Sequence, residues 1–165
     1  MTRTIHRLKE RLATAEDLTP DILGKASVFV RRGWNERLQT KGLPPDDTSL
    51  GFFKRSAYVV ITTFMEAPNG EEIIQQGVVD CNRVPKKGPT YDENPFHWGL
   101  LAMFSEHSII NKDQRRLFAN QLLYAHRHYV PEHYLIGFIY QLGRSDRIYA
   151  KVKEKNQEPW FDYDD

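Results

Sequence analysis

Two stretches rich in β-branched residues, joined by an Asn-Gly pair, constrain the fold of this chain more than any other feature. Residues 56–65 read Ser-Ala-Tyr-Val-Val-Ile-Thr-Thr-Phe-Met, and residues 73–80 read Ile-Ile-Gln-Gln-Gly-Val-Val-Asp. Between them lies Ala67-Pro68-Asn69-Gly70, and Asn-Gly is the commonest dipeptide of tight hairpin turns. The pattern predicts a β-hairpin. Because a hairpin of two strands is only marginally stable, helices or a third strand must cover its apolar face.

A candidate for the third strand lies near the C-terminus. Ile148, Ala150 and Val152 alternate with polar or basic residues, which is the period of two expected of a strand with one solvated face. Lys151 and Lys153 are typical of an edge strand, where charge discourages pairing with other chains. The sequence therefore predicts an α+β fold with a small antiparallel sheet.

About five helices account for most of the remaining chain. Their expected starts are residue 5, Thr19-Pro20, Asn94-Pro95, Asn111 with Gln114 as a capping box, and Pro131. Gly33 lies inside the second helix, where it marks a kink or a close approach of another backbone. The helix after Pro131 is apolar on nearly every side, which is typical of a helix buried in a core or in a partner.

Length and composition limit the class of protein. A chain of 165 residues predicts one domain, here residues 1–157, followed by a distinct tail over residues 158–165. The net charge of +1 argues against a uniformly basic nucleic-acid binder. Cys81 stands alone, so an intrachain disulfide and a cysteine-based zinc site are excluded. With no membrane-length apolar run, no secretory signal and no cofactor motif, we expect a cytoplasmic protein without a cofactor.

The tail combines acidic and aromatic residues. It reads Glu-Pro-Trp-Phe-Asp-Tyr-Asp-Asp from residue 158 to residue 165. Exposed aromatic surface is unfavourable in water, so Trp160, Phe161 and Tyr163 either pack on their own domain or enter a partner, with Asp164 beside them. The tail is one predicted partner-binding segment.

Histidine and tyrosine gather between residues 124 and 133. The run Tyr-Ala-His-Arg-His-Tyr-Val-Pro-Glu-His precedes the apolar helix, and Tyr129 and His128 are predicted to contact a partner. An alternative is a metal site formed by His126, His128 and His133, because neutral imidazole is a common metal ligand. A structural alternative is that these rings fill the junction between two helices.

The segment from Arg127 to His133 resembles the Arg-(polar)-x4-His signature of HEPN ribonucleases. In that family a histidine serves as general acid or base and an arginine stabilises the phosphate, at the mouth of a bundle of helices. The resemblance implies metal-independent RNA cleavage with Arg127 and His133 as the functional pair, and it implies an all-helical fold.

Basic residues suggest a third class of function. Arg31, Arg32 and Arg37 on the second helix, and Lys86 and Lys87 in the loop before Asn94, could contact a phosphate backbone. These residues make non-catalytic nucleic-acid binding an alternative.

The sequence as a whole favours a non-catalytic, intracellular protein-protein interaction subunit or adaptor, which docks through aromatic-rich surfaces. Such a subunit or inhibitor could be encoded by a host or by a phage. No nucleotide-binding loop, metal motif or catalytic signature points elsewhere, whereas 20 of the 165 residues are aromatic (9 Phe, 8 Tyr and 3 Trp). The ribonuclease and the nucleic-acid-binding protein are the alternatives.

Overall fold

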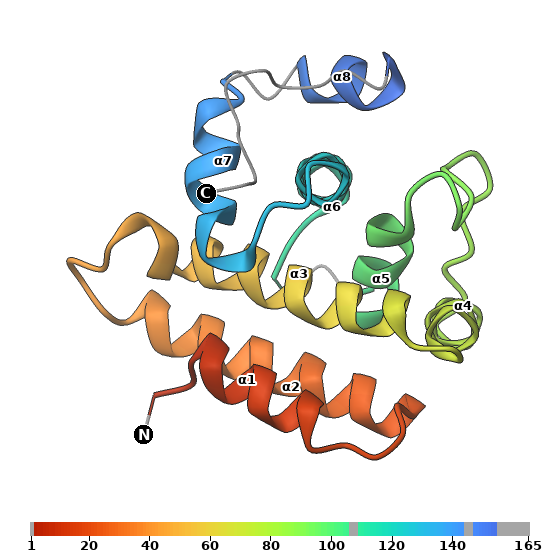
Figure 1. The fold of residues 1–165 in the computed structure, drawn as a ribbon, viewed down its shortest axis with the longest axis horizontal. Helices are drawn as coiled ribbons and strands as arrows, with labels where there is room; N and C mark the ends of the chain where they lie inside the picture. The colour runs from red at the N-terminus through yellow and green to blue at the C-terminus, as the bar shows by residue number, and fades with distance from the viewer. Residues whose placement is uncertain (1, 106–108, 144–146, 155–165) are drawn as a thin grey trace.

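The computed structural model describes residues 2–105, 109–143 and 147–154. The described chain forms only helices, in the order α1 (Ile5–Ala13), α2 (Pro20–Leu38), η1 (Pro45–Asp47), α3 (Ser49–Glu66), α4 (Gly70–Asp80), α5 (Pro95–Met103), α6 (Lys112–Arg127), η2 (Glu132–Tyr134), α7 (Leu135–Gln141) and α8 (Ile148–Glu154). In Figure 1, α3 runs through the middle, with α1 and α2 on one side and α6 and α7 on the other.

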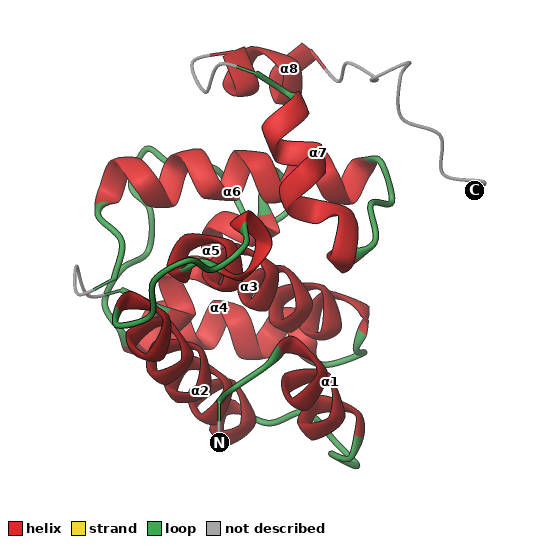
Figure 2. Cartoon of the chain, turned by 90° about the vertical axis from the view of Figure 1, so that its left-hand side faces the viewer, coloured by secondary structure: helices red, strands yellow, loops and turns green. Residues whose placement is uncertain are grey.

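The predicted α+β fold is wrong, because the described residues contain no strand (Figure 2). The expected hairpin is two helices: its first strand lies inside α3, and its second lies inside α4. The expected third strand is α8.

Burial explains why the sequence of α3 resembles that of a strand. Thr48 begins the helix, since its hydroxyl accepts a hydrogen bond from the Gly51 amide at 3.1 Å. Residues 56–61 are all buried, so neighbouring helices cover α3 on nearly every side and no apolar period is visible. Tertiary burial then outweighs the preference of Val59 and Val60 for strands.

The Asn-Gly pair does form a tight turn, but the turn joins two helices. The Gly70 amide donates to the Ala67 carbonyl at 3.1 Å, directly after α3 ends and where α4 begins. A Cβ atom on Gly70 would lie 1.5 Å from the Phe64 carbonyl oxygen. Glycine is therefore required here by the close approach of two backbone segments.

The alternation near the C-terminus fits a helix equally well. Ile148 and Val152 are four residues apart and so share one helix face. Ile148 is buried and Val152 packs against the core. Arg127 Nη1 donates to the Val152 carbonyl at 2.6 Å, which fastens α8 to α6.

The helix starts predicted from caps are confirmed. Thr19 caps α2 through the Ile22 amide, Asn94 caps α5, and Asn111 with Gln114 forms the complete capping box of α6. The segment after Pro131 begins as η2 and continues as α7, and Gly143 follows it with φ +82°.

An ion network fastens α1 and α3 to η2. The Glu132 carboxylate accepts hydrogen bonds from Lys9 Nζ at 2.8 Å and from Arg55 Nε at 2.7 Å. Its side chain is 8% exposed, and that of Arg55 is 15% exposed. Burial opposes ionisation of Glu132, but the hydrogen bonds and positive charges of Lys9 and Arg55 outweigh it and lower the pKa of this carboxyl.

Tyr58 joins α3 to the turn after α6. Its buried hydroxyl donates to the Val130 carbonyl at 2.8 Å, and its ring stacks on Phe96. We expect Tyr58→Phe to lower the free energy of unfolding by about 1–2 kcal/mol, because the buried carbonyl loses its donor. Urea denaturation would measure this loss. Tyr140→Phe, at a side chain that is 86% exposed, is the matched control and should change stability by less than about 0.5 kcal/mol.

No helix in the described part of the chain is both long and apolar enough to cross a membrane.

Candidate functional site

The histidine and tyrosine run forms the end of α6 and the turn that follows it. His128 is fully buried, and its Nδ1 lies 2.8 Å from the Tyr124 carbonyl oxygen. Tyr129 follows in the left-handed region with φ 54° and is 79% exposed. Of the two residues predicted to contact a partner, only Tyr129 therefore lies at the surface, and His128 belongs to the core.

Arg127 and His133 lie on either side of this turn, and no described hydrogen bond or ring contact joins them. The Arg127 guanidinium is engaged with the Val152 carbonyl, whereas His133 is exposed and packs on the Tyr134 ring at 4.1 Å between centroids. The all-helical fold agrees with what the HEPN resemblance implies, but a fold class is shared by many functions. The described geometry thus gives the ribonuclease pair no direct support.

The three histidines of the alternative metal site point into different surroundings. His126 is half-buried against Phe96, His128 is bonded to Tyr124, and His133 is exposed. Among residues 2–105, 109–143 and 147–154, no three His, Cys, Asp or Glu side chains are grouped so as to hold a metal ion.

Arg37 has a structural role. It is 5% exposed, and its guanidinium donates to the Asp47 carboxylate at 2.9 Å and to the carbonyls of Gly33 and Arg3. A guanidinium enclosed in this way is not available to a phosphate backbone.

The other basic residues predicted to bind nucleic acid come from two separate parts of the chain. Arg31 is half-buried and Arg32 is exposed on α2, whereas Lys86 and Lys87 are exposed in the loop between α4 and α5. The predicted partner-binding residues Trp160, Phe161, Tyr163 and Asp164 lie outside the described residues.

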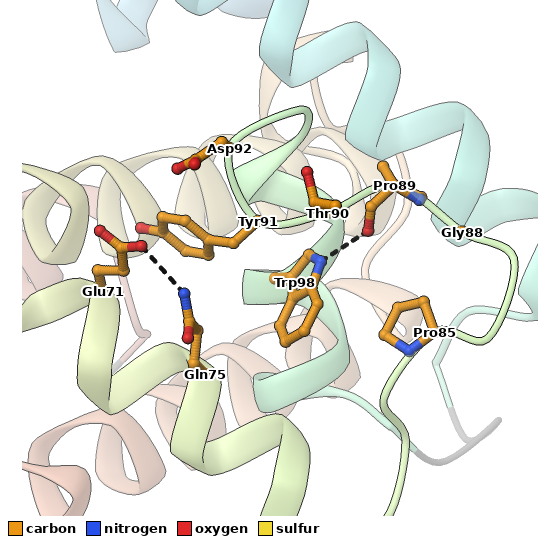
Figure 3. A pocket seen from close by; sticks show the side chains of 9 residues that line it. All are labelled: Glu71, Gln75, Pro85, Gly88, Pro89, Thr90, Tyr91, Asp92 and Trp98. Carbon is orange, nitrogen blue, oxygen red and sulfur yellow. Dashed lines mark hydrogen bonds between the residues drawn. The ribbon is translucent and has the colours of Figure 1, made fainter.

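A cavity that the sequence did not reveal lies where the loop between α4 and α5 passes these two helices. Its volume is about 330 Å³, and Figure 3 shows Glu71 and Gln75 of α4 facing Tyr91 and Trp98 across it. We call it the Tyr91–Trp98 pocket; it is lined by Glu71, Gln75, Pro85, Gly88, Pro89, Thr90, Tyr91, Asp92 and Trp98.

Local hydrogen bonds fix the loop that carries Tyr91 and Asp92. Thr90 and Glu93 bond reciprocally: the Thr90 hydroxyl donates to the Glu93 carboxylate at 3.1 Å, and the Glu93 amide donates to the Thr90 hydroxyl at 3.3 Å. Directly afterwards, Asn94 caps α5. Tyr91 and Asp92 are thus held in a short, capped turn that enters a helix.

Two aromatic rings form the walls of the pocket. Trp98 Nε1 donates to the Pro89 carbonyl at 2.8 Å, so the polar edge of the indole is bonded to the loop. The Tyr91 and Trp98 rings meet edge to face, with centroids 6.5 Å apart and an interplanar angle of 75°. The hydrogen bond and this ring contact preorganise both walls.

The pocket is acidic. Glu71 accepts a hydrogen bond from Gln75 at 3.0 Å, and no described basic side chain pairs with Glu71 or Asp92. Burial, reinforced by the charges of Glu71 and Asp92, raises the pKa of Tyr91 to about 12, so its phenol stays protonated at neutral pH.

His97, the residue before Trp98, adds no positive charge at neutral pH. Burial, together with the positive charges of Arg115 and Arg116, lowers the pKa of His97 to about 4. The neighbouring imidazole is therefore neutral, so it does not offset the carboxylates of Glu71 and Asp92.

This arrangement suits an organic cation. Aromatic faces attract cations through the quadrupole of the ring, and unpaired carboxylates supply the complementary charge. A guanidinium fits best, because it can stack on an indole and donate to carboxylate oxygens at the same time.

One sequence signal could have indicated the pocket. Thr90-Tyr91-Asp92-Glu93 has the Thr-x-x-Glu pattern of a capping box, directly before the Asn94-Pro95 start of a helix. That pattern fixes a turn, but it does not show that α4 lies opposite. Glu71 and Gln75 reach the site only through the packing of α4 on α5.

Comparison with known proteins gives no match: no protein-family model matches the sequence, and neither a curated protein nor a solved structure is found to resemble it.

Proposed function

We propose that this protein is a non-catalytic, cytoplasmic interaction subunit that binds a partner protein by receiving an arginine side chain of the partner in the Tyr91–Trp98 pocket. One observation carries the proposal: two aromatic walls and two carboxylates line the same open cavity, and no described basic side chain is paired with either carboxylate. Buried aromatic and arginine contacts are the usual hot spots of protein interfaces.

The chemistry of the lining favours binding over catalysis. The pocket is lined by no histidine, cysteine, lysine or serine that could act with the carboxylates as a nucleophile or proton shuttle. The Thr90 hydroxyl is already engaged with Glu93.

Titration with short peptides tests the proposal on the full chain. The indole N–H resonance of Trp98 is expected to shift with acetyl-Gly-Arg-Gly-amide and to stay in place with the citrulline analogue, which has the same shape but no charge. Glu71→Gln should weaken binding of the arginine peptide about fivefold, which corresponds to about 1 kcal/mol.

Glu72→Gln is the matched control, because Glu72 lies next to Glu71 on α4, is exposed and does not line the pocket. Its affinity for the arginine peptide should equal that of the wild type. Equal binding of the citrulline peptide, or an equal loss in both variants, would exclude a pocket selective for a cation.

A further inference from the structure

A second and larger cavity of opposite character lies between α1 and α2, which run side by side in Figures 1 and 2. Its volume is about 590 Å³. We call it the α1–α2 groove; it is lined by Arg3, Arg11, Pro20, Asp21, Gly24, Lys25, Val28, Phe29 and Arg32.

The rim of the groove is basic. Four of its residues are cationic: Arg3 is paired with Glu36, and Lys25 is paired at 3.0 Å with Asp21, which carries the only carboxylate of the lining, so Arg11 and Arg32 supply the excess charge. Arg11 lies over the Phe29 ring, with its Cζ 4.9 Å from the ring centroid, and Arg32 is exposed. This excess of positive charge is complementary to an acidic ligand.

The floor of the groove is apolar and open. Gly24 and Val28 are one helical turn apart on α2, and Val28 is 46% exposed. A Cβ atom on Gly24 would meet no other atom within 4 Å, so the glycine leaves a gap in the helix surface. A gap beside an exposed valine can receive one apolar side chain.

These two features together favour a protein segment over a nucleic acid. A phosphate backbone requires cations but gains nothing from an apolar floor. An acidic peptide with an apolar anchor uses both, as peptides do that lie in grooves between helices.

We propose that the α1–α2 groove binds an acidic segment of a partner protein, which places an apolar side chain over Gly24 and Val28 and its carboxylates against Arg11 and Arg32. The Tyr91–Trp98 pocket has the opposite charge and is lined by none of the same residues, so the groove does not depend on it. A chain with both sites joins an acidic partner to a basic one.

Fluorescence anisotropy of the full chain with a labelled peptide tests the groove. The probe is Glu-Pro-Trp-Phe-Asp-Tyr-Asp-Asp, which carries four carboxylates and three aromatic rings. The chain contains this sequence once, at residues 158–165, so every variant carries the same internal competitor. Gly24→Leu, which fills the gap, and Arg32→Glu, which reverses one charge of the rim, should each weaken binding about tenfold.

Asn35→Leu is the matched control, because Asn35 is also exposed on α2 but does not line the groove, and its affinity should stay within about twofold of the wild type. The amide probe, with Gln and Asn in place of Glu and Asp, should bind about tenfold more weakly. Circular dichroism would show that each variant keeps its helices. Unchanged affinity in Gly24→Leu would overturn the proposal. The proposal would also be overturned if the chain bound a single-stranded oligonucleotide through Arg32 and did not bind the peptide.

Discussion

Glu132→Ala is expected to lower the free energy of unfolding by about 2–4 kcal/mol, and the melting temperature by about 5–10 °C. The cost arises because Arg55, which is mostly buried, loses the carboxylate that accepts from its Nε and Nη2. Lys9 is half-exposed, so water replaces most of its share. Thermal and urea denaturation would both report the loss.

The acid limb of the stability curve provides an independent check. The pKa of Glu132 in the folded chain is lower than its ordinary value of 4.5. The stabilisation that its ionised carboxylate gives the fold is therefore complete above pH 4.5, and it disappears as the pH falls through the pKa of the folded state. The difference in stability between wild type and Glu132→Ala should therefore be largest at neutral pH and narrow in acid.

Glu10→Ala is the control for this variant. It removes a carboxylate from α1 whose partner, His6, is exposed, and it should cost less than about 0.5 kcal/mol. If Glu132→Ala cost no more than Glu10→Ala, the network would make no net contribution to stability.

Two glycines of α2 are expected to respond to alanine in opposite directions. A Cβ atom on Gly33 would lie 2.3 Å from Cε1 of Phe52, a ring that is fully buried and has the Arg37 guanidinium stacked over it. Gly33→Ala should therefore destabilise the fold by about 1–3 kcal/mol through overpacking, despite the better helix propensity of alanine. Gly24→Ala meets no atom and should stabilise the fold by up to about 1 kcal/mol.

Urea denaturation of the two variants side by side would separate close packing from helix propensity. A second substitution makes the contrast sharper: Phe52→Leu removes Cε1 and Cζ, the two ring atoms nearest to a Gly33 methyl group. In that background Gly33→Ala should lose most of its cost, because the two positions are in contact and their effects do not add. Equal effects of alanine at positions 24 and 33 would show that the ring moves aside freely.

Local capping residues predicted the starts of α2, α5 and α6, whereas β-branched residues and the Asn-Gly pair favoured strands where α3 and α4 form. Thr19, Asn94 and Asn111 act locally, so their roles could be read from a few neighbouring residues. Residues 56–61 span more than one helical turn and are all buried, so this part of α3 shows no helical period, and its β-branched residues favour a strand. At ten residues, the segment from residue 56 to residue 65 is already longer than most strands, which was a signal for a helix.

The candidate sites were harder to predict because each one joins separate elements. Arg32 was singled out, but the groove around it exists only because α1 packs beside α2 and because Gly24 has no side chain. The capping-box pattern of Thr90 and Glu93 predicts the turn that carries Tyr91 and leads into the helix of Trp98. The position of Glu71, in contrast, depends on how α4 packs on α5. Charge and composition do not contain that information.

The central position of α3 has a consequence for synthesis on the ribosome. Its buried residues, among them Phe52, Phe53 and Val60, are covered partly by α1 and α2, which are made earlier, and partly by α5, α6 and α7, which are made later. A nascent chain that ends after α3 therefore exposes an apolar helix face that only later residues can cover. Since such surface promotes aggregation, this face of α3 is the part of the nascent chain most prone to wrong contacts until α7 has left the ribosome.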